Sequence, residues 1–218
     1  MKERNRTQEV LWLVITGALG AAQGCAPVFS DLQGARVLAP GKVEVTPSFS
    51  AVLASANGET DHAQDHLGVQ VATGVSPGVE LRGRAEYVKV GGLLDDGPSI
   101  NWFSAGPKIS LAKDRLAAYL PVAFAVNEDF DDSGLVTAAP TLLATVPLTE
   151  NRTDLNFSGK ALIPLSYDGD VLAAVNVGLA LGSDLSCWAL RPEVGILFNP
   201  GEDGYYTHAS LGLSFTAR

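Results

Sequence analysis

The chain has 218 residues, of which 46% are hydrophobic, and it carries a net charge of −9 with a pI near 4.7. This length suits a single domain. The acidic surplus argues against a nucleic-acid partner, because phosphate backbones are bound by basic faces. The two cysteines, Cys25 and Cys187, are too few for a disulfide framework or a cysteine-rich zinc site. We find no cofactor motif and no metal-site spacing.

Residues 1–24 predict a signal peptide. Lys2, Arg4 and Arg6 form a positive start, residues 10–22 are apolar, and small residues follow. Thirteen apolar residues are too short to span a bilayer comfortably, since a helical span needs about 20. The alternative is a buried or anchoring helix.

Cys25 follows the sequence AAQG, which loosely resembles the lipidation signal of bacterial lipoproteins. Lipidation of Cys25 and ordinary cleavage after Gly24 are both compatible with these residues. A single acyl chain would add a modest anchor. We expect residues 25–40 to form a periplasmic segment and residues 41–218 to form one β-domain.

From Gly41 onward the chain predicts strands separated by turn residues. Ten segments can be drawn, most of them 10 to 14 residues long: 42–54, 66–75, 79–90, 100–111, 116–126, 135–148, 153–166, 171–182, 187–198 and 205–215. A tilted strand needs about 9–11 residues to cross a membrane, whereas strands of soluble proteins are usually nearer five or six.

Each segment alternates between apolar and polar residues, so one face of each strand is apolar. Within 79–87, Val79, Leu81 and Tyr87 lie opposite Glu80 and Arg82. The polar faces carry charges in mid-strand, and these are the candidate site residues: Glu80, Arg82, Arg84, Glu86, Lys108, Lys160, Arg191 and Glu193. In a membrane barrel, lipid contacts the apolar face and the lumen takes the charges.

The connections also alternate in length. We expect polar loops at 55–65, 91–99, 127–134, 167–170 and 199–204, and tight turns at 76–78, 112–115, 149–152 and 183–186. Outer-membrane barrels have longer extracellular loops, short periplasmic turns and an even number of strands. These features favour an all-β, antiparallel, up-and-down transmembrane β-barrel of about ten strands, closed by its first strand against its last.

The last strand alternates toward a near-terminal aromatic, through Tyr205, Thr207, Ala209, Leu211, Leu213 and Phe215. With the strand lengths and the connections, this makes the chain resemble the small, porin-like outer-membrane β-barrel proteins of Gram-negative bacteria, from about Gly41 to the end. Thr216, Ala217 and Arg218 depart from the pattern, because they follow the aromatic that usually comes last. The resemblance implies an outer-membrane location, with outer-membrane lipid, lipopolysaccharide and the barrel-assembly machinery as partners.

For function, two classes remain open. The charged faces predict a nearly balanced network that fills the lumen, which suits a structural or narrow-pore role. His208 and Ser210 share a face of the last strand, and their spacing resembles that of outer-membrane lipid A deacylases. A lipid-modifying hydrolase that uses these two residues is therefore the alternative, although no acidic partner can be assigned. A soluble ligand-binding barrel is a weaker option. We expect no enzyme, no catalytic residues, no cofactor and no metal.

Two further features call for comment. Acidic and histidine side chains gather at Glu59, Asp61, His62, Asp65 and His66, and a second acidic stretch covers 127–132; we expect solvated loops at both.

Prolines fall inside the expected strands, where each removes a ladder hydrogen bond, so we expect bulges or access of lumen water at these points: Pro47, Pro107, Pro121, Pro140, Pro147, Pro164 and Pro192.

Overall fold

The computed structural model describes residues 26–127 and 132–217, and for Asp132 and Ser133 it describes the backbone alone. The expected signal peptide, Cys25 and residues 128–131 of the second acidic stretch lie outside the described residues. Within the described part of the chain, no helix is long and apolar enough to cross a membrane.

The described residues form twelve β-segments. These are β1 (Val43–Ala56), β2 (Glu59–Ser76), β3 (Val79–Val90), β4 (Ser99–Ala112), β5 (Leu116–Tyr119), β6 (Val122–Asn127), β7 (Asp132–Ala138), β8 (Thr141–Thr149), β9 (Thr153–Pro164), β10 (Leu172–Leu181), β11 (Trp188–Phe198) and β12 (Tyr205–Ala217). Segments β5 and β6 both pair with β4, and β7 and β8 both pair with β9. Each of these two pairs is therefore one barrel strand with a break, which gives ten strands.

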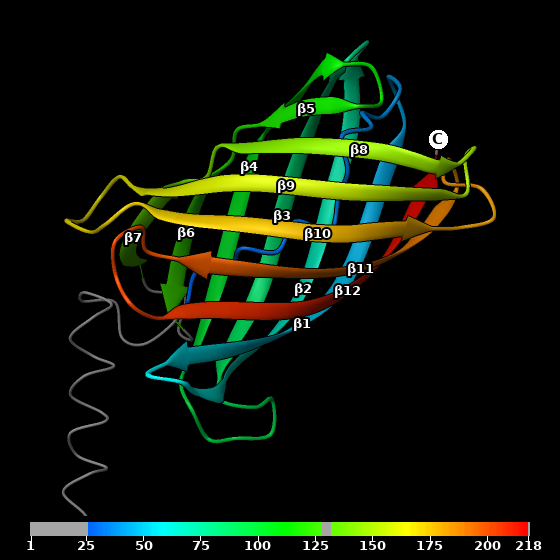
Figure 1. Ribbon diagram of the computed structural model, residues 1–218. Helices are drawn as coiled ribbons and strands as arrows, with labels where there is room; N and C mark the ends of the chain where they lie inside the picture. Colours follow the sequence, from blue (N-terminus) through cyan, green and yellow to red (C-terminus); the bar gives the residue numbers. More distant parts are fainter. Residues whose placement is uncertain (1–25, 128–131, 218) are drawn as a thin grey trace, which may run out of the picture.

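All neighbours in the barrel are antiparallel, and the ring closes where β1 pairs with β12 (Figure 1). The closing ladder is long, running from Val43 opposite Ala217 to Ser55 opposite Tyr205. A closed barrel leaves no unpaired edge, which is what a sheet in a bilayer requires. The expected ten-stranded, up-and-down transmembrane β-barrel is confirmed.

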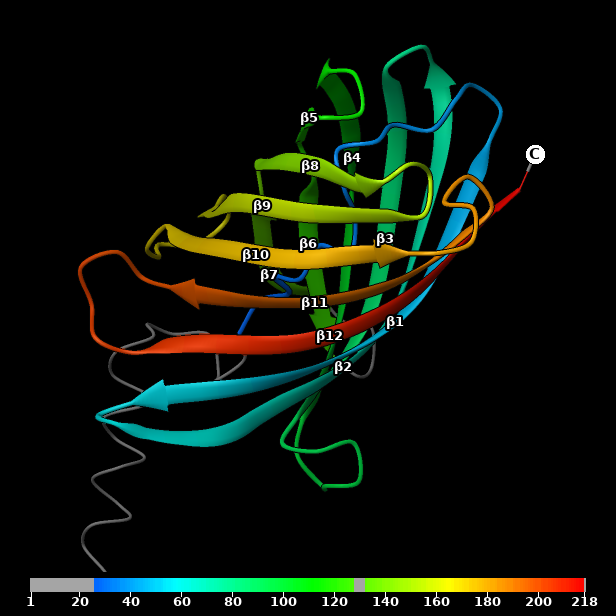
Figure 2. The ribbon, with the colours of Figure 1, turned by 45° about the vertical axis from the view of Figure 1, so that its right-hand side comes forward.

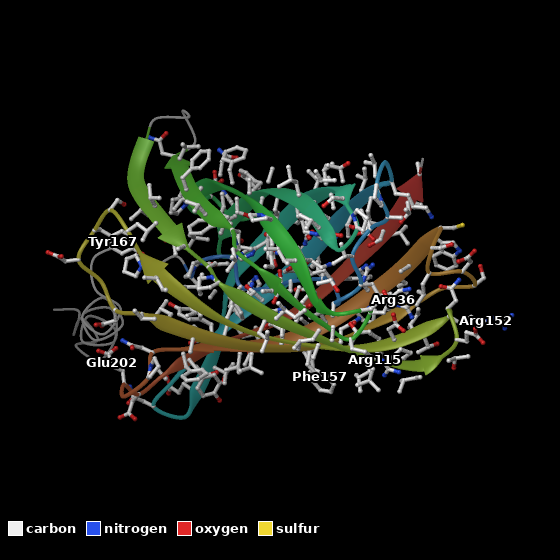
Figure 3. All side chains as sticks on the ribbon, turned by 90° about the horizontal axis from the view of Figure 1, so that it is seen from above. Arg36, Arg115, Arg152, Phe157, Tyr167 and Glu202 are labelled. Carbon is white, nitrogen blue, oxygen red and sulfur yellow. The ribbon has the colours of Figure 1, made fainter. Side chains whose placement is uncertain are left out.

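The outer surface of the barrel is apolar. Large apolar side chains are 40–51% exposed there, among them Val71, Leu81, Phe157, Val175 and Leu211. Figure 3 shows Phe157 on the outside of the wall. Many alternate residues of the same strands are buried and polar, such as Gln70, Glu80 and Asn176, and smaller apolar clusters lie among them. The continuous apolar face therefore points outward. A soluble barrel has the opposite arrangement, with its apolar face inside.

The strand breaks fall at prolines. Pro121 separates β5 from β6, Pro140 separates β7 from β8, and Pro164 ends β9. The β8–β9 register also shifts between Pro147 and Thr149. The other three prolines stay paired with one neighbouring strand and interrupt the ladder to the other. Pro47 lies at a gap toward β12, Pro192 lies at a gap toward β10, and Pro107 lies opposite the break between β5 and β6.

The two ends of the barrel differ in their connections. Among the described residues, the turn end carries 77–78, 113–115, 150–152 and 182–187, and the loop end carries 57–58, 91–98, 165–171 and 199–204. In Figure 3, Arg115 and Arg152 mark the turn end, and Tyr167 and Glu202 mark the loop end.

The first connection contradicts the expected long loop at 55–65. Asn57 and Gly58 alone join β1 to β2, both with positive φ (54° and 81°), as in a tight hairpin turn. The polar residues after Gly58 continue the strand beyond the apolar belt, so that β2 reaches 18 residues.

At the turn end, the side chain of Asp184 stabilises the connection from β10 to β11. Asp184 accepts hydrogen bonds from the amide and the hydroxyl of Ser186, at 2.8 and 2.7 Å. These bonds lower the pKa of Asp184 to about 2. The ionised form of the carboxylate is therefore favoured in this turn.

The residues before β1 lie inside the barrel. We call Ala26–Ala39 the lumenal segment; from the sequence we expected it in the periplasm. Ala26 packs with Leu162, Leu197 and Tyr206 near the loop end, and at the other end the amide of Gly41 donates to the carbonyl of Gly74. The segment therefore enters at the loop end and runs through the lumen to the turn end (Figure 2).

Candidate functional site

Glu193 of β11 holds the middle of the lumenal segment. Its two carboxylate oxygens accept hydrogen bonds from the amides of Asp31 and Leu32, each at 2.7 Å. Leu32 has a φ of 52°, a left-handed conformation that costs a leucine about 1–2 kcal/mol. The left-handed conformation of Leu32 directs two successive amides toward the Glu193 carboxylate. The backbone of the segment therefore fits the barrel wall at β11.

Asp31 is the anionic anchor of the segment. Its carboxylate lies 2.8 Å from Lys160 Nζ on β9 and accepts bonds from Ser158 and from Asn176 on β10. Asn176 also donates to the carbonyl of Phe29, at 2.8 Å. Because Asp31, Ser158 and Asn176 are buried, these bonds satisfy polar atoms that are largely shielded from water.

Apolar side chains of the segment add packing. Phe29 and Leu32 are each 1% exposed, and Phe29 meets the ring of His208 edge-on with centroids 4.7 Å apart. Burying a leucine or phenylalanine contributes about 1.5–3 kcal/mol. The segment is therefore held in the lumen by apolar packing as well as by hydrogen bonds and ion pairs.

Arg84 of β3 joins the segment to the opposite wall. Its guanidinium donates to the carbonyl and the hydroxyl of Ser30, at 2.5 and 2.6 Å, and it forms an ion pair with Glu86. Glu86 also lies 3.4 Å from the Nδ1 atom of His66 on β2. The lumenal segment thus bonds to walls on both sides.

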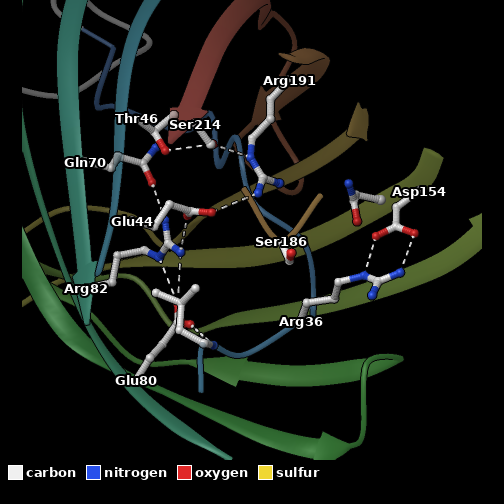
Figure 4. Close-up of polar contacts among 12 residues, drawn as sticks. Arg36, Glu44, Thr46, Gln70, Glu80, Arg82, Asp154, Ser186, Arg191 and Ser214 are labelled. Carbon is white, nitrogen blue, oxygen red and sulfur yellow. Dashed lines mark hydrogen bonds and ion pairs between the residues drawn. The ribbon is translucent and has the colours of Figure 1, made fainter. Parts of the chain in front are cut away.

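Nearer the turn end, five charged side chains form a network. Arg82 donates to Glu44 at 2.8 Å and to Glu80 at 3.0 Å, Arg191 donates to Glu44 at 3.1 Å, and Lys108 lies 3.2 Å from Glu80. Figure 4 shows Glu44 between the two arginines. Pairing of this kind makes buried charge tolerable. The segment joins the network where Glu80 accepts from the amide of Leu38 and Lys108 donates to the carbonyl of Arg36.

Arg36 and Gly34 fix the lower part of the segment. Arg36 donates to both oxygens of Asp154 on β9, at 2.5 and 2.9 Å. Gly34 passes so close to the wall that an added Cβ would lie 2.7 Å from Thr145 Oγ1. The same Thr145 oxygen accepts from the amide of Ala35, at 2.7 Å. Only glycine allows this approach.

The structure places the eight charged residues selected from the sequence on the inner face. Each makes an ion pair or a charged hydrogen bond there: Glu80, Arg82, Arg84, Glu86, Lys108, Lys160, Arg191 and Glu193. Sequence reasoning missed their partners Asp31 and Arg36, which belong to the lumenal segment. The only available signal was the mixture of polar and apolar residues at 28–38, which has no strand periodicity.

His208 and Ser210 do lie together on β12. His208 Nδ1 is 2.6 Å from Ser210 Oγ, its Nε2 is 3.0 Å from Asn176 Oδ1, and Glu193 is 3.8 Å away. Both side chains face the lumen and are covered, since His208 packs against Phe29 and Ser210 donates to Ser50. The lipid phase lies on the other side of the wall.

The histidine and acidic residues near the first hairpin do not converge. Glu59, Asp61, His62 and Asp65 lie along β2 instead of in a loop, and His62 pairs with Asp65 at 3.3 Å. His66 points inward to Glu86. Within residues 26–127 and 132–217, no group of three or more His, Cys, Asp or Glu side chains could hold a metal ion.

Two cavities lie beside the lumenal segment. A cavity of about 30 Å³ lies beside Trp102 and Tyr119, and a larger one of about 180 Å³ lies at the turn end. Gln33 borders both cavities, so the lumenal segment separates them.

A closed antiparallel barrel with an apolar outer belt and charged side chains on its inner face defines this chain as a transmembrane β-barrel. No protein-family model and no curated relative matches the sequence. Similar solved structures include the translocator domain of the autotransporter NalP from Neisseria meningitidis, with 8% identity, a TM-score of 0.49, and coverage of 96% of this chain and 94% of that one.

Two other barrels are also similar. An outer membrane channel from Pseudomonas putida F1 has 12% identity and a TM-score of 0.46, covering 87% of this chain and all of the other. Ail, the attachment invasion locus protein of Yersinia pestis, has 10% identity and a TM-score of 0.39, with 82% and 99% covered.

Proposed function

We propose that this protein is an outer-membrane β-barrel whose lumen is closed by its own N-terminal segment, with a structural or narrow-pore role. The apolar belt requires lipid around the barrel, and the strands have the length that crosses a bilayer. Outer-membrane lipid and lipopolysaccharide are the surrounding partners in this proposal, and the barrel-assembly machinery inserts the chain.

The contacts of the lumenal segment with several strands of the wall are the observation that supports a closed lumen. The lumenal segment is bonded to β3 through Arg84, to β9 through Asp154 and Lys160, and to β11 through Glu193. These strands lie on different sides of the barrel, so the segment crosses the lumen instead of lining one wall. Ten strands enclose a narrow interior, and open aqueous channels appear at about 16 strands.

A lipid hydrolase is the less favoured function. An acyl substrate would have to reach Ser210 Oγ from the membrane, yet this hydroxyl is buried in the lumen and donates to Ser50. Deacylase and lipase assays on the purified barrel test this alternative. Activity that disappears in both His208→Ala and Ser210→Ala would favour the enzyme.

Two measurements test the proposal. The full chain should fractionate with the outer membrane and should migrate faster on a gel before heating than after it, as stable barrels do. In a liposome-swelling assay with small sugars, liposomes that contain the protein should swell at the same rate as protein-free liposomes or only slightly faster. Recovery as a detergent-free soluble protein, or rapid swelling, would contradict the proposal.

A further inference from the structure

The larger cavity, at the turn end, has an unusual charge balance for an acidic protein. It is bordered by five cationic side chains and only three carboxylates: Arg36, Lys42, Arg82, Lys108 and Arg191 against Glu44, Asp114 and Asp154. The chain as a whole carries −9. Glu80 does not border the cavity but pairs with Arg82 and Lys108, so five cations face four carboxylates in total. This cavity of about 180 Å³ therefore keeps a surplus of one positive charge.

Most carboxylate oxygens that border this cavity already accept hydrogen bonds from arginines. Both oxygens of Glu44 accept from arginines, and both oxygens of Asp154 accept from Arg36. Asp114, in a turn at the rim, is the remaining carboxylate. Consequently the buried carboxylates have little capacity left to bind a cation.

The donors, in contrast, are not used up. Within the described residues, the Lys42 ammonium makes no hydrogen bond or ion pair, and Nη1 of Arg36 and of Arg191 makes none either. Guanidinium and ammonium groups bind oxyanions through charge-assisted hydrogen bonds, which are about twice as strong as neutral ones. Figure 4 shows Arg36 and Arg191 on opposite sides of this space.

Gln33 supplies an independent observation. Gln33 borders this cavity as well as the smaller one, it is 4% exposed, and its buried Oε1 atom has no hydrogen-bond partner among the described residues. A buried acceptor without a partner calls for a donor. An oxyanion that carries a hydroxyl group, such as hydrogen phosphate, offers negative oxygens to the cations and an O–H to Gln33.

We propose that the turn-end cavity bordered by Arg36, Lys42, Arg191 and Gln33 binds a small free oxyanion bearing a hydroxyl group, of the hydrogen phosphate class. The site faces the compartment on the turn side of the barrel. It rests on the lumenal segment being in place, but it does not require that the barrel conduct. Binding without conductance would therefore support this inference even if the pore role failed.

Titration calorimetry on the full chain in phosphatidylcholine nanodiscs at low salt, with inorganic phosphate as the probe, tests the proposal. We expect saturable binding that is tighter than that of sulfate, which has no hydroxyl group. Lys42→Ala should weaken it roughly two- to fivefold, as expected for the loss of one half-exposed ion pair. Gln33→Met should reduce the preference for phosphate over sulfate.

Lys113→Ala is the matched control, because Lys113 is exposed on a turn at the same end and does not border the cavity. It should leave binding unchanged. Heat-modifiable migration of every variant shows that the barrel is intact. No saturable phosphate binding in the wild type, or equal losses in Lys42→Ala and Lys113→Ala, would overturn the proposal. Competition by phosphatidylglycerol in the nanodisc would also overturn it, since the ligand would then be a lipid headgroup.

Discussion

Arg36 and Asp154 form a two-point ion pair between the lumenal segment and β9, with Nε and Nη2 of the arginine 2.5 and 2.9 Å from the two carboxylate oxygens. The residues are 118 positions apart in the sequence. The pair therefore exists only when the segment lies inside the closed barrel, and it reports directly on that state.

The first prediction concerns the energy of this pair. A double-mutant cycle with Arg36→Ala and Asp154→Asn should give a coupling of about 1 kcal/mol in the free energy of unfolding, because the arginine is partly exposed and partly screened. Arg115→Ala, an exposed arginine at the same end, is the control. Strict additivity of Arg36→Ala and Asp154→Asn would show that the pair does not form.

The second prediction concerns Glu193. Glu193→Ala removes both acceptors from the amides of Asp31 and Leu32, and hydrogen bonds to charged groups contribute about 1.5–3 kcal/mol each. We expect the exchange protection of these two amides to fall at least roughly tenfold. Hydrogen-exchange mass spectrometry measures it. Glu202→Gln, on an exposed loop, should change nothing, and unaltered protection in Glu193→Ala would contradict the placement of the segment.

The third prediction uses two glycines. Gly34→Ala introduces a Cβ against Thr145 and Asn156 and should destabilise the barrel by about 1–3 kcal/mol. Gly159→Ala adds the same atom on β9 where nothing lies within 4 Å, so its effect should stay within about 0.5 kcal/mol. Chemical denaturation of the two variants compares them. Equal effects would mean that the segment does not pass close to the wall at Gly34.

The fourth prediction concerns orientation. Cys187 is exposed at the turn end. In a Cys25→Ser background, a membrane-impermeant maleimide should label Cys187 only after the cells are permeabilised, because short turns lie on the periplasmic side of outer-membrane barrels. Glu202→Cys, combined with Cys187→Ser, places a thiol at the loop end and should be labelled on intact cells. The reversed labelling pattern would show the opposite orientation.

The strands could be predicted because their constraint is local. A lipid-facing wall and a polar lumen impose a period of two on each strand, and Val79 to Tyr87 carries that period plainly. The same constraint explains why the sequence predicts β2 to start at residue 66, whereas the strand starts at Glu59. The polar run after Gly58 lies beyond the apolar belt, where no lipid imposes alternation, and the Asn57-Gly58 turn was the better signal.

The lumenal segment could not be predicted, because its partners are distant in the sequence. Asp31 contacts Lys160, and Ser30 contacts Arg84 across the barrel. An extended insert without neighbouring strands has no periodicity of its own. The charges of the wall could be selected from the sequence, but the segment that pairs with several of them could not be recognised without the fold.

Single-channel recording of the full chain in planar lipid bilayers tests the closed lumen most directly. The wild type should show no current or only small ones, because the lumenal segment fills the interior. Arg82→Ala or Arg84→Ala, which removes a guanidinium from the network, should enlarge any small current. Large, stable and ungated currents from the wild type would contradict the closed-lumen account.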